Sequence, residues 1–389
     1  MKVCWKILSY VMTVLLTAAI TLTICLITFG PNSKGANKLV QLETLIGECF
    51  IGEVDVSEME DAAAIAMVEC LDRWSYYIPA DQYQAYQEQM DNAYVGVGIT
   101  IQLDEESKGF RIKEVTQNGP AREAGIQVDD ILIGAAGQDI RGMDTEGVAG
   151  LVKGKENTKV ELTVLRDGEE KRFTVTRKKV AVTVATGTML DGGIGLVTIE
   201  NFDARCAEET IAAIDSLVEQ GATAIIFDVR NNPGGFAAEM VEILDYLLPK
   251  GELFRTVDYR DREDVQMSDA KYLDLPMAVL VNRNSYSAAE FFAAALNDYD
   301  AAVIVGEQTS GKGHFQNTFE LSDGSAVSLS VGKYFTPGGV SLEGVGITPE
   351  VPVAVNEETE ALIYYNQLPA AEDPQIQAAI AALKGQNNG

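Results

Sequence analysis

TAIIFDVRNNPGGF, residues 223–236, is the stretch of sequence that decides the fold. Residues 223–229 form an apolar run rich in β-branched side chains, which predicts a buried strand. The Asn-Pro-Gly-Gly sequence that follows is typical of a turn, and residues 236–248 then repeat apolar side chains at helical spacing. A strand, a turn and a helix in succession are the repeating unit of an α/β layer with largely parallel strands.

The same alternation extends in both directions from this stretch. We expect strands at 194–199, 277–281 and 302–305, and helices at 206–220 and 288–296. Gly221 is a stop signal for the first of these helices. Residues 315–353 return to the alternation typical of β-strands. The sequence therefore predicts an α/β core over residues 181–355.

The regions outside this core differ in character. Residues 93–180 hold short strand-like runs and the hairpin signal Asp167-Gly168, which together predict a β-rich domain. Residues 35–92 carry apolar side chains at helical spacing, so we expect a helical region there. Residues 356–389 contain one amphipathic helical pattern, over 374–383, and a polar end.

Composition excludes several classes of function. Asp and Glu outnumber Lys and Arg by 58 to 30, which gives a formal net charge of −28, and no basic cluster is present. Nucleic acid is therefore not an expected partner, because binding to phosphates needs clustered Lys and Arg. The five cysteines are scattered without a CxxC pair, so the sequence predicts no metal site.

Residues 7–29 form an uncharged and mostly apolar run that follows Lys2 and Lys6. At about 1.5 Å per residue, a helix of this length reaches across a hydrocarbon core of about 30 Å. The run is longer than the roughly 7–15 apolar residues of a cleaved signal peptide. We therefore expect residues 1–34 to form a cytoplasmic stub, a single uncleaved transmembrane anchor and a linker. We expect the anchor to lie in a bacterial cell membrane and the bulk of the chain to lie outside the cytoplasm.

Three polar loops follow three of the predicted strands of the core. These loops are residues 231–235, 284–287 and 309–313. In an open α/β sheet, the carboxyl ends of parallel strands meet at one edge, and sites form there. We therefore expect the three loops to converge on one site.

Ser287 and Lys312 are the candidate reactive pair of this site. A serine nucleophile needs a base, and His314 is the only histidine of the chain, so a lysine base is the simpler choice. Lys312 would have to be neutral near pH 7.5, which requires its pKa to fall by about 2–3 from the free value of about 10.4, as burial can achieve. Gln316 is a candidate to hold the amine in place.

Backbone N–H groups complete the predicted chemistry. Ser287 precedes a helix, so the N–H of Ala288 can donate to an oxyanion, and Gly234 or Gly235 can supply a second donor. A structural interpretation is also open, because Ser287-Ala288-Ala289-Glu290 fits a capping box that simply starts a helix. The P-loop-like run that ends at Gly311-Lys312 has Gly313 where Ser or Thr is needed, so we do not expect nucleotide binding.

Several blocks of this sequence resemble the carboxyl-terminal processing peptidases, which are Ser-Lys proteases with a PDZ domain. The blocks occur in the family's order and are LDRWSYY at 71–77, YVGVGI at 94–99, GPA at 119–121, AGI at 124–126, DI at 130–131, DVRNNPGG at 228–235, SAAE at 287–290, GKGHFQ at 311–316, YFTPGG at 334–339 and GITP at 346–349. In the family register the nucleophile stands three residues before the glutamate, which selects Ser287 over Ser285. The resemblance covers residues 39–353.

The resemblance implies a fold, a reaction and a partner. The fold is a ClpP/crotonase-like α/β protease core with an inserted PDZ β-rich domain at 93–180. The reaction is endoproteolysis in the C-terminal regions of extracytoplasmic proteins through an acyl-enzyme. The implied catalytic residues are Ser287, Lys312 and Gln316. No metal or cofactor is implied, whereas self-association is a further expectation because family members often form homo-oligomers.

The PDZ domain implied by the resemblance would bind peptide tails. Its carboxylate-binding loop would be formed by Tyr94, Val95, Gly96, Val97, Gly98 and Ile99. Such a loop captures an extended chain end by β-addition, so protein substrates with apolar C-termini are the expected partners. The domain would deliver the tail to Ser287 or open the site by moving.

The chain departs from the family pattern at four positions. Tyr286 stands where a small residue is usual, Ser310 where Phe is usual, His314 where a Thr-like residue is usual, and Asp129 where Gly is usual. None of these changes removes Ser287, Lys312 or Gln316. Two alternatives stay open: a catalytically inactive PDZ adaptor that binds protein tails at the membrane, and an α/β enzyme of acyl chemistry of the crotonase type.

Overall fold

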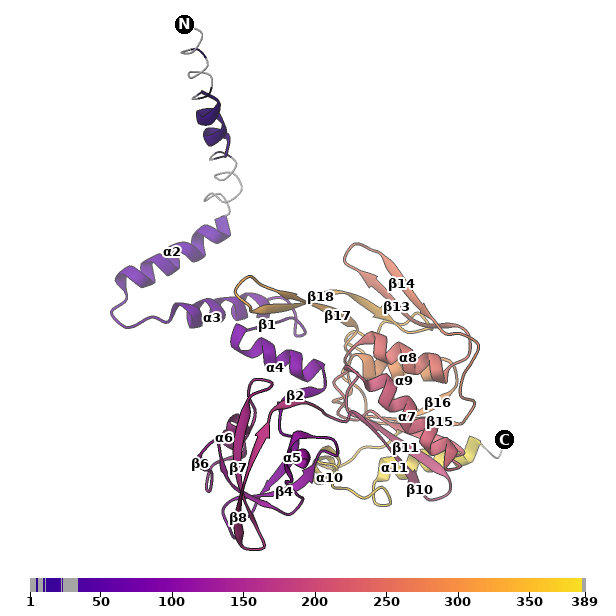
Figure 1. Ribbon diagram of the computed structural model, residues 1–389. Helices are drawn as coiled ribbons and strands as arrows, with labels where there is room; N and C mark the ends of the chain where they lie inside the picture. Colours follow the sequence, from indigo (N-terminus) through magenta and orange to yellow (C-terminus); the bar gives the residue numbers. More distant parts are fainter. Residues whose placement is uncertain (1–4, 6–9, 11, 22, 24–33, 387–389) are drawn as a thin grey trace. The chain divides into compact units, whose positions relative to one another are not determined.

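The computed structural model describes Trp5, Tyr10, residues 12–21, Thr23 and residues 34–386, and divides the chain into two compact units, one up to Cys70 and one from Leu71 onward. From Lys34 onward, the first unit contains α2 (Lys34–Cys49) and α3 (Val56–Glu69). Asp55 caps α3, because its side chain accepts the N–H of Glu58 at 3.1 Å. The helical pattern expected at these positions is therefore present (Figure 1).

The single transmembrane anchor predicted over residues 7–29 is a wrong prediction. Among the described residues, no helix is both long and apolar enough to cross a membrane. Residues 7–9, 11, 22 and 24–29 of the predicted anchor lie outside the described residues.

The second unit is built on a six-stranded sheet with the order β10-β11-β12-β15-β16-β19. All neighbouring pairs are parallel except β10 with β11. The strands are β10 (Ala185–Leu190), β11 (Ile194–Ile199), β12 (Ala224–Asp228), β15 (Met277–Val281), β16 (Ala302–Gly306) and β19 (Val351–Pro352). The helices that alternate with them are α7 (Cys206–Glu219), α8 (Ala237–Leu247) and α9 (Ala288–Asp298). The predicted α/β alternation is confirmed for β11, β12, β15 and β16.

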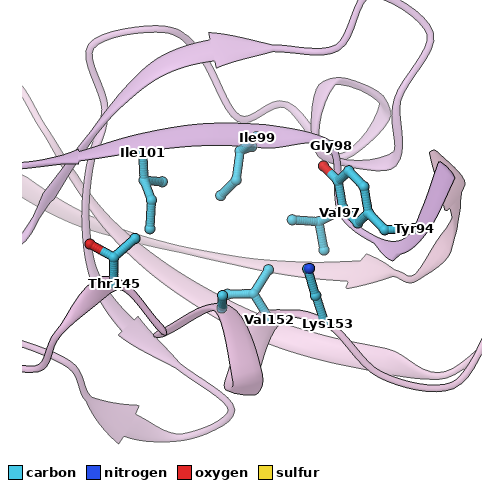
Figure 2. A pocket seen from close by; sticks show the side chains of 9 residues that line it. Tyr94, Val97, Gly98, Ile99, Ile101, Thr145, Val152 and Lys153 are labelled. Atoms are coloured by element: carbon cyan, nitrogen blue, oxygen red, sulfur yellow. The ribbon is translucent and has the colours of Figure 1, made fainter. Parts of the chain in front are cut away.

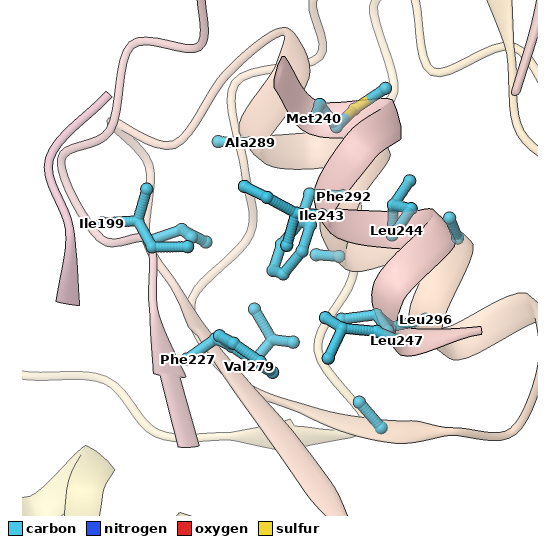
Figure 3. Close-up of a cluster of buried hydrophobic side chains, with 14 of the residues drawn as sticks. Ile199, Phe227, Met240, Ile243, Leu244, Leu247, Val279, Ala289, Phe292 and Leu296 are labelled. Carbon is cyan, nitrogen blue, oxygen red and sulfur yellow. The ribbon is translucent and has the colours of Figure 1, made fainter. Parts of the chain in front are cut away.

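Burial on both faces explains why the strands of this sheet read as continuous apolar runs. Ile225 and Phe227 of β12 pack in a core cluster with α7, α8 and α9. Ala224 and Ile226 of the same strand face the opposite way, onto α11 (Pro374–Gln386). Figure 3 shows Phe227 among side chains of α8 and α9, including Ile243, Leu244, Phe292 and Leu296.

A second sheet of this unit has the order β1-β18-β13-β14, and β17 also pairs with β18. Its strands are β1 (Tyr76–Ile78), β13 (Glu252–Asp258), β14 (Glu263–Met267), β17 (His314–Glu320) and β18 (Ala326–Phe335). Strand β1 lies in the region predicted to be helical, which otherwise continues with α4 (Ala80–Met90). The short run Tyr76-Tyr77-Ile78 has the aromatic and β-branched composition of a strand, and pairing with β18 fixes it as one.

The β-rich domain contains a sheet with the order β3-β4-β5-β7-β8, with β6 paired to β5. Its elements are β3 (Ile99–Leu103), β4 (Phe110–Val115), α5 (Pro120–Ala124), β5 (Ile131–Ala135), β6 (Gln138–Asp139), α6 (Thr145–Val152), β7 (Lys159–Arg166) and β8 (Glu169–Thr176). The first and last strands of the domain, β2 (Ala93–Gly96) and β9 (Lys178–Ala181), pair with each other. The predicted hairpin is confirmed, because Asp167 and Gly168 both have positive φ, of 55° and 80°, between β7 and β8.

The region after residue 355 contains α11 and also a helix that the sequence did not predict, α10 (Glu357–Tyr364). Asn356 caps α10 by accepting the N–H of Thr359 at 2.8 Å. Helix α11 packs on the six-stranded sheet through Ile376, Ala379 and Leu383. The carboxyl-terminal segment is therefore part of the folded core, and the domain limits that we drew from the sequence stay predictions.

Candidate active site

The three polar loops converge as expected. Strands β12, β15 and β16 are parallel neighbours in the sheet, so the loops after them lie at one edge. The loop after β12 contacts the loop after β15, because Tyr286 N–H donates to the carbonyl of Asn232 at 3.2 Å. The loop after β15 contacts the loop after β16, because Ser310 N–H donates to the carbonyl of Ser285 at 3.2 Å.

Ser287 has an unusual backbone at the point where β15 has ended and α9 begins. Its φ is 58° and its ψ is −126°, a region that a non-glycine residue enters only at a cost of about 1–3 kcal/mol. The strain is held by neighbours: Ser287 N–H donates to Glu290 Oε2 at 3.0 Å, as in a capping box. The side chain is 8% exposed. A serine on a tight, strained strand-to-helix turn is a common arrangement for a nucleophile.

Ser285, the alternative serine, is occupied by structural bonds. Its Oγ donates to the carbonyl of Val229 at 2.7 Å and accepts the N–H of Asn282 at 3.0 Å. Asn282 in turn exchanges two hydrogen bonds of 2.9 Å with Asn231 in the loop after β12. These bonds fix the two loops to each other and leave Ser287 as the serine available for chemistry.

Glycine is required at position 234 by close approach. Gly234 has φ +91°, and a Cβ there would lie 2.7 Å from Ser287 Cβ and 2.9 Å from the nitrogen of Ala288. The N–H of Gly234 already donates to Asn232 Oδ1 at 2.8 Å. Ala288 occupies the first position of α9, where N–H groups have no intrahelical partner. Among the predicted oxyanion donors, the N–H of Gly234 therefore has a structural partner and the N–H of Ala288 has no intrahelical one, and Gly235 lies against Phe202 and Asp203. The oxyanion roles of Gly234, Gly235 and Ala288 stay predictions.

Glu290 links the serine loop to the lysine loop. It is fully buried, at 0% exposure, and its Oε1 accepts the N–H of Gly311 while its Oε2 accepts the N–H of Lys312, both at 2.8 Å. Thr309 Oγ1 also donates to Glu290 Oε1. Burial raises the pKa of Glu290, and these donors oppose that rise. The sequence indicated only a capping role for Glu290, whereas in the structure Glu290 lies between the loops that carry Ser287 and Lys312.

The amine of Lys312 lies over two aromatic rings. Nζ is 5.0 Å from the ring centroid of Trp74 and 5.8 Å from that of Tyr286. Burial lowers the pKa of Lys312 to about 8, against the opposing charges of Asp72, Glu290 and Glu343. Among the described residues, no hydrogen bond joins Lys312 Nζ to Ser287 Oγ. The pKa of Lys312 is thus shifted in the direction that a lysine base needs, and the pairing of Lys312 with Ser287 stays a prediction.

Gln316 does not hold the amine in this conformation. Its Nε2 donates to the carbonyl of His314 at 3.1 Å and to Ser330 Oγ at 3.0 Å. His314 Nδ1 lies 3.7 Å from Glu343 Oε2, which places the single histidine in an ion-pair position next to the lysine loop. The catalytic role of Gln316 stays a prediction.

Residues 72–75, just before β1, contribute side chains that the sequence analysis did not assign to the site. Asp72 Oδ1 accepts the N–H groups of Trp74 at 2.8 Å and Ser75 at 2.7 Å, which forms a tight turn. Arg73 Nη2 donates to the carbonyls of Ser310 at 3.1 Å and Gly311 at 3.3 Å. The Asp-x-x-Ser spacing was a turn signal, but nothing in the sequence indicated that this turn faces Lys312.

A groove in the β-rich domain has a volume of about 110 Å³. It lies between β3 and α6 and is lined by Tyr94, Val97, Gly98, Ile99, Ile101, Thr145, Ala149, Val152 and Lys153. Figure 2 shows Ile99 and Ile101 pointing across the groove toward Val152 and Thr145. Four of the six predicted loop residues line this groove; Val95 and Gly96 instead pair with Lys179 and Lys178 of β9.

Two separate parts of the chain match known domain families. Residues 193–353 match the model of Peptidase family S41, and residues 111–166 match that of a PDZ domain. The fold and the site thus define a serine protease of the α/β class that carries a PDZ domain. Among the described residues, no group of three or more His, Cys, Asp or Glu side chains is placed to hold a metal ion.

Comparison with individual proteins places the chain more narrowly. It is 33% identical over 312 residues to the carboxyl-terminal-processing protease of Synechocystis, which covers 78% of this chain and 72% of that protein. It is 31% identical over 363 residues to a probable CtpA-like serine protease of Staphylococcus aureus, which covers 90% of this chain and 72% of that protein. A solved structure, the photosystem II D1 C-terminal processing protease, has 26% identity and a TM-score of 0.48, with 86% of this chain and 91% of that chain covered. The chain belongs to the carboxyl-terminal-processing proteases of peptidase family S41, as the sequence blocks predicted.

Proposed function

We propose that this protein is an endopeptidase that cleaves the C-terminal regions of proteins through a Ser287–Lys312 acyl-enzyme mechanism. The observation that carries the proposal is the lowered pKa of Lys312, about 8, in a loop bound to the same Glu290 that binds the N–H of Ser287. A buried amine with this pKa is partly neutral near neutral pH and can accept a proton.

The proposed reaction has two halves. Neutral Lys312 accepts the Ser287 Oγ proton as Oγ attacks the substrate carbonyl, and the N–H groups of Ala288 and Gly235 stabilise the oxyanion. Collapse breaks the peptide C–N bond, and the lysine proton passes to the leaving amine. Water then attacks the acyl-serine ester with Lys312 again as base, which releases the new carboxyl end and restores the Ser287 hydroxyl.

The PDZ groove supports a specificity for chain ends. Its side walls are aliphatic, with Ile99 and Ile101 on one side and Val152 on the other, so an apolar last residue fits them. Lys153 Nζ lies 5.3 Å from the Tyr94 ring centroid at this groove, where it can attract a terminal carboxylate. We propose that the groove binds the apolar C-termini of protein substrates and thereby delivers them or opens the site.

A catalytically inactive PDZ adaptor is the second candidate function. Two observations favour it: the large Tyr286 beside the nucleophile, and the missing hydrogen bond between Ser287 and Lys312 in the described part of the chain. An adaptor would bind the same tails without cutting them. The predicted location outside the cytoplasm and the predicted self-association stay predictions.

Incubation of the full chain with an unstructured polypeptide that ends in Leu-Ala-Val tests both functions. The peptidase predicts cleavage that is lost in Ser287→Ala and in Lys312→Met, with the melting temperature of each variant confirming its fold. An adaptor predicts binding without cleavage by the wild-type chain. Cleavage that persists in both variants would overturn the Ser-Lys mechanism.

A further inference from the structure

We propose that Trp74 and Tyr286 are positioning residues for Lys312, and that their ring faces hold the amine beside the nucleophile loop in place of hydrogen-bond acceptors. This inference rests on the proposed function in one respect, that Lys312 is the base. It assigns a role to two aromatic residues that the reaction described above does not use.

The first observation is the arrangement of rings around the amine. The rings of Trp74 and Tyr286 are stacked, with centroids 6.0 Å apart and planes inclined by 26°, and Lys312 Nζ lies over both of them. Within the described residues the amine has no hydrogen-bond acceptor. A ring face attracts an ammonium group through its quadrupole but offers no lone pair to share its proton. Such a site holds the side chain and still lets the nitrogen become neutral.

The second observation is that Trp74 is fixed by its neighbours on both sides. Asp72 binds the N–H of Trp74, Arg73 binds two carbonyls of the lysine loop, and Ser75 Oγ accepts the N–H of Ser330 at 3.1 Å. The indole Nε1 is nevertheless buried without a hydrogen-bond partner. A buried, unpaired donor is destabilising, so the hydrogen-bonding capacity of the indole does not explain a tryptophan here. What Trp74 does contribute at this position is a large ring face next to Lys312 Nζ.

The third observation concerns the charges that surround the lysine. Asp72 from the turn, Glu290 from α9 and Glu343 from the loop before β19 all favour the ammonium form. The guanidinium carbon of Arg73 lies 4.2 Å from the centroid of the same Trp74 ring, so this ring has two cations next to it. A second cation on this ring weakens its attraction for a charged Lys312. The rings of Trp74 and Tyr286, which we call the aromatic cage, can therefore hold Lys312 in both its charged and its neutral form.

The test measures the titration of Lys312 directly in the full chain. Lysine labelled with carbon-13 at Cε gives a resonance for Lys312 that is assigned by its loss in Lys312→Met. Trp74→Leu and Tyr286→Leu keep the site apolar but remove one ring face each, whereas Trp74→Phe and Tyr286→Phe keep a ring. We expect each leucine variant to lower the pKa of Lys312 by about 0.5–1, because a ring face favours the charged amine. The phenylalanine variants should stay within about 0.3 of the wild-type value on the same argument.

The outcomes separate this inference from the proposed function. If both leucine variants titrate as their phenylalanine partners do, the cage proposal is overturned even when proteolysis depends on Ser287 and Lys312. If the pKa moves as expected but the wild-type chain cleaves nothing, the cage stands and the peptidase function falls. Should Trp74→Leu fail to fold, the Tyr286 pair decides the question alone, because Tyr286 is only half-buried.

Discussion

Lys312 is the residue on which the chemistry depends, because an amine with an ordinary pKa is charged at neutral pH and cannot accept a proton. Burial lowers the pKa of Lys312 to about 8. The neutral form therefore predominates above about pH 8 and declines tenfold for each pH step below it. The sequence could identify the residue from the scarcity of histidine, but the aromatic surroundings that accompany its burial depend on residues far apart in the chain.

We expect kcat/KM for the Leu-Ala-Val polypeptide to rise with pH and level off above a midpoint near 8. The rise has this sign because only the neutral amine can accept the Ser287 proton. The measurement is kcat/KM from pH 6 to 10 at constant ionic strength. A flat profile, or a midpoint near the ordinary lysine pKa of about 10.4, would count against a lysine base.

Replacement of Glu290 by Gln should lower both stability and activity. The carboxylate accepts N–H groups from Ser287, Gly311 and Lys312, and an amide places a donor where only acceptors fit. We expect a loss of about 1–3 kcal/mol in the free energy of unfolding by urea, together with a fall in kcat. Glu208→Gln, on the exposed part of α7, is the matched control. Equal stability of the two variants would show that Glu290 does not link the loops.

Asp203 is a buried carboxyl group that the proposed reaction leaves unused. It is 3% exposed, its Oδ1 has no hydrogen-bond partner, and burial together with nearby Glu239 raises its pKa to about 7. When the pKa of a carboxyl group is higher in the folded state than in the unfolded state, the folded protein becomes less stable as the pH rises between the two values. For Asp203 this range runs from about 4 to about 7.

Asp203→Asn should therefore stabilise the fold at pH 8 and have much less effect at pH 5. We expect a gain of at least about 1 kcal/mol at pH 8, since each unit of raised pKa corresponds to about 1.4 kcal/mol. Urea unfolding at the two pH values measures it, with exposed Asp191→Asn as the control. A gain that is the same at both pH values would mean that ionisation of Asp203 is not its cause.

At the scale of single elements, the loop after β12 depends on glycine. Gly234→Ala would place a methyl group 2.7 Å from Ser287 Cβ in a backbone with φ +91°. The expected result is displacement of Ser287 from Ala288 and Gly235, with a fall in kcat of roughly 100-fold or more, the loss typical of a disturbed oxyanion site. Gly221→Ala serves as the control, because it has a similar φ of +94° but open space around its Cβ. If both variants retain the same kcat, close approach at Gly234 is not what shapes the site.

The groove between β3 and α6 gives a second prediction for an element. Ala149→Phe should fill the groove and abolish binding of a fluorescent peptide that ends in Leu-Ala-Val, as measured by anisotropy. Gly150→Phe lies next to it on α6, where a Cβ meets nothing within 4 Å, and should leave binding intact. Amidation of the peptide's C-terminus should weaken binding if the groove recognises the free terminal carboxylate. Undiminished binding by Ala149→Phe would place the tail elsewhere.

The elements that the sequence predicted are those whose pattern is local. Strands β11 and β15 are short apolar runs next to helical stripes, and the predicted bounds of both are those observed. Strand β13 was missed because its sequence, ELFRTVD, mixes charged and apolar residues and takes its conformation from pairing with β14 and β18. The strand-like run at residues 94–99 is divided between β2 and β3, because Gly98 has φ +76°.

At the scale of the whole second unit, the carboxyl-terminal helix is tied to the loop after β12 by one buried arginine. Arg230 binds Asp228 at the end of β12, Asp373 Oδ2 at 2.8 Å and Gln375 Oε1 at 2.9 Å, the last two at the start of α11. The pair with Asp228 is local, because the two residues are two positions apart. The pair with Asp373 could not be predicted from the sequence, because that partner is 143 residues away along the chain.

Asp373→Asn should destabilise the second unit, since it leaves part of the charge of Arg230 buried and unpaired. We expect a loss of about 3 kcal/mol in the free energy of unfolding by urea, the lower end of the range for a broken buried pair. Glu372→Gln, an exposed neighbour, controls for the change of charge. An Asp373→Asn chain as stable as this control would show that α11 docks without the ion pair.

The central claim, that Lys312 activates Ser287, can be tested most directly by the rate at which a fluorophosphonate phosphonylates the full chain at different pH values. The reagent forms a phosphorus–oxygen bond to an activated serine and releases fluoride, and mass spectrometry locates the product. The account predicts labelling of Ser287 at a rate that rises with a midpoint near pH 8 and is lost in Lys312→Met. Labelling of Ser287 at the same rate without the lysine, or labelling of a different residue, would contradict it.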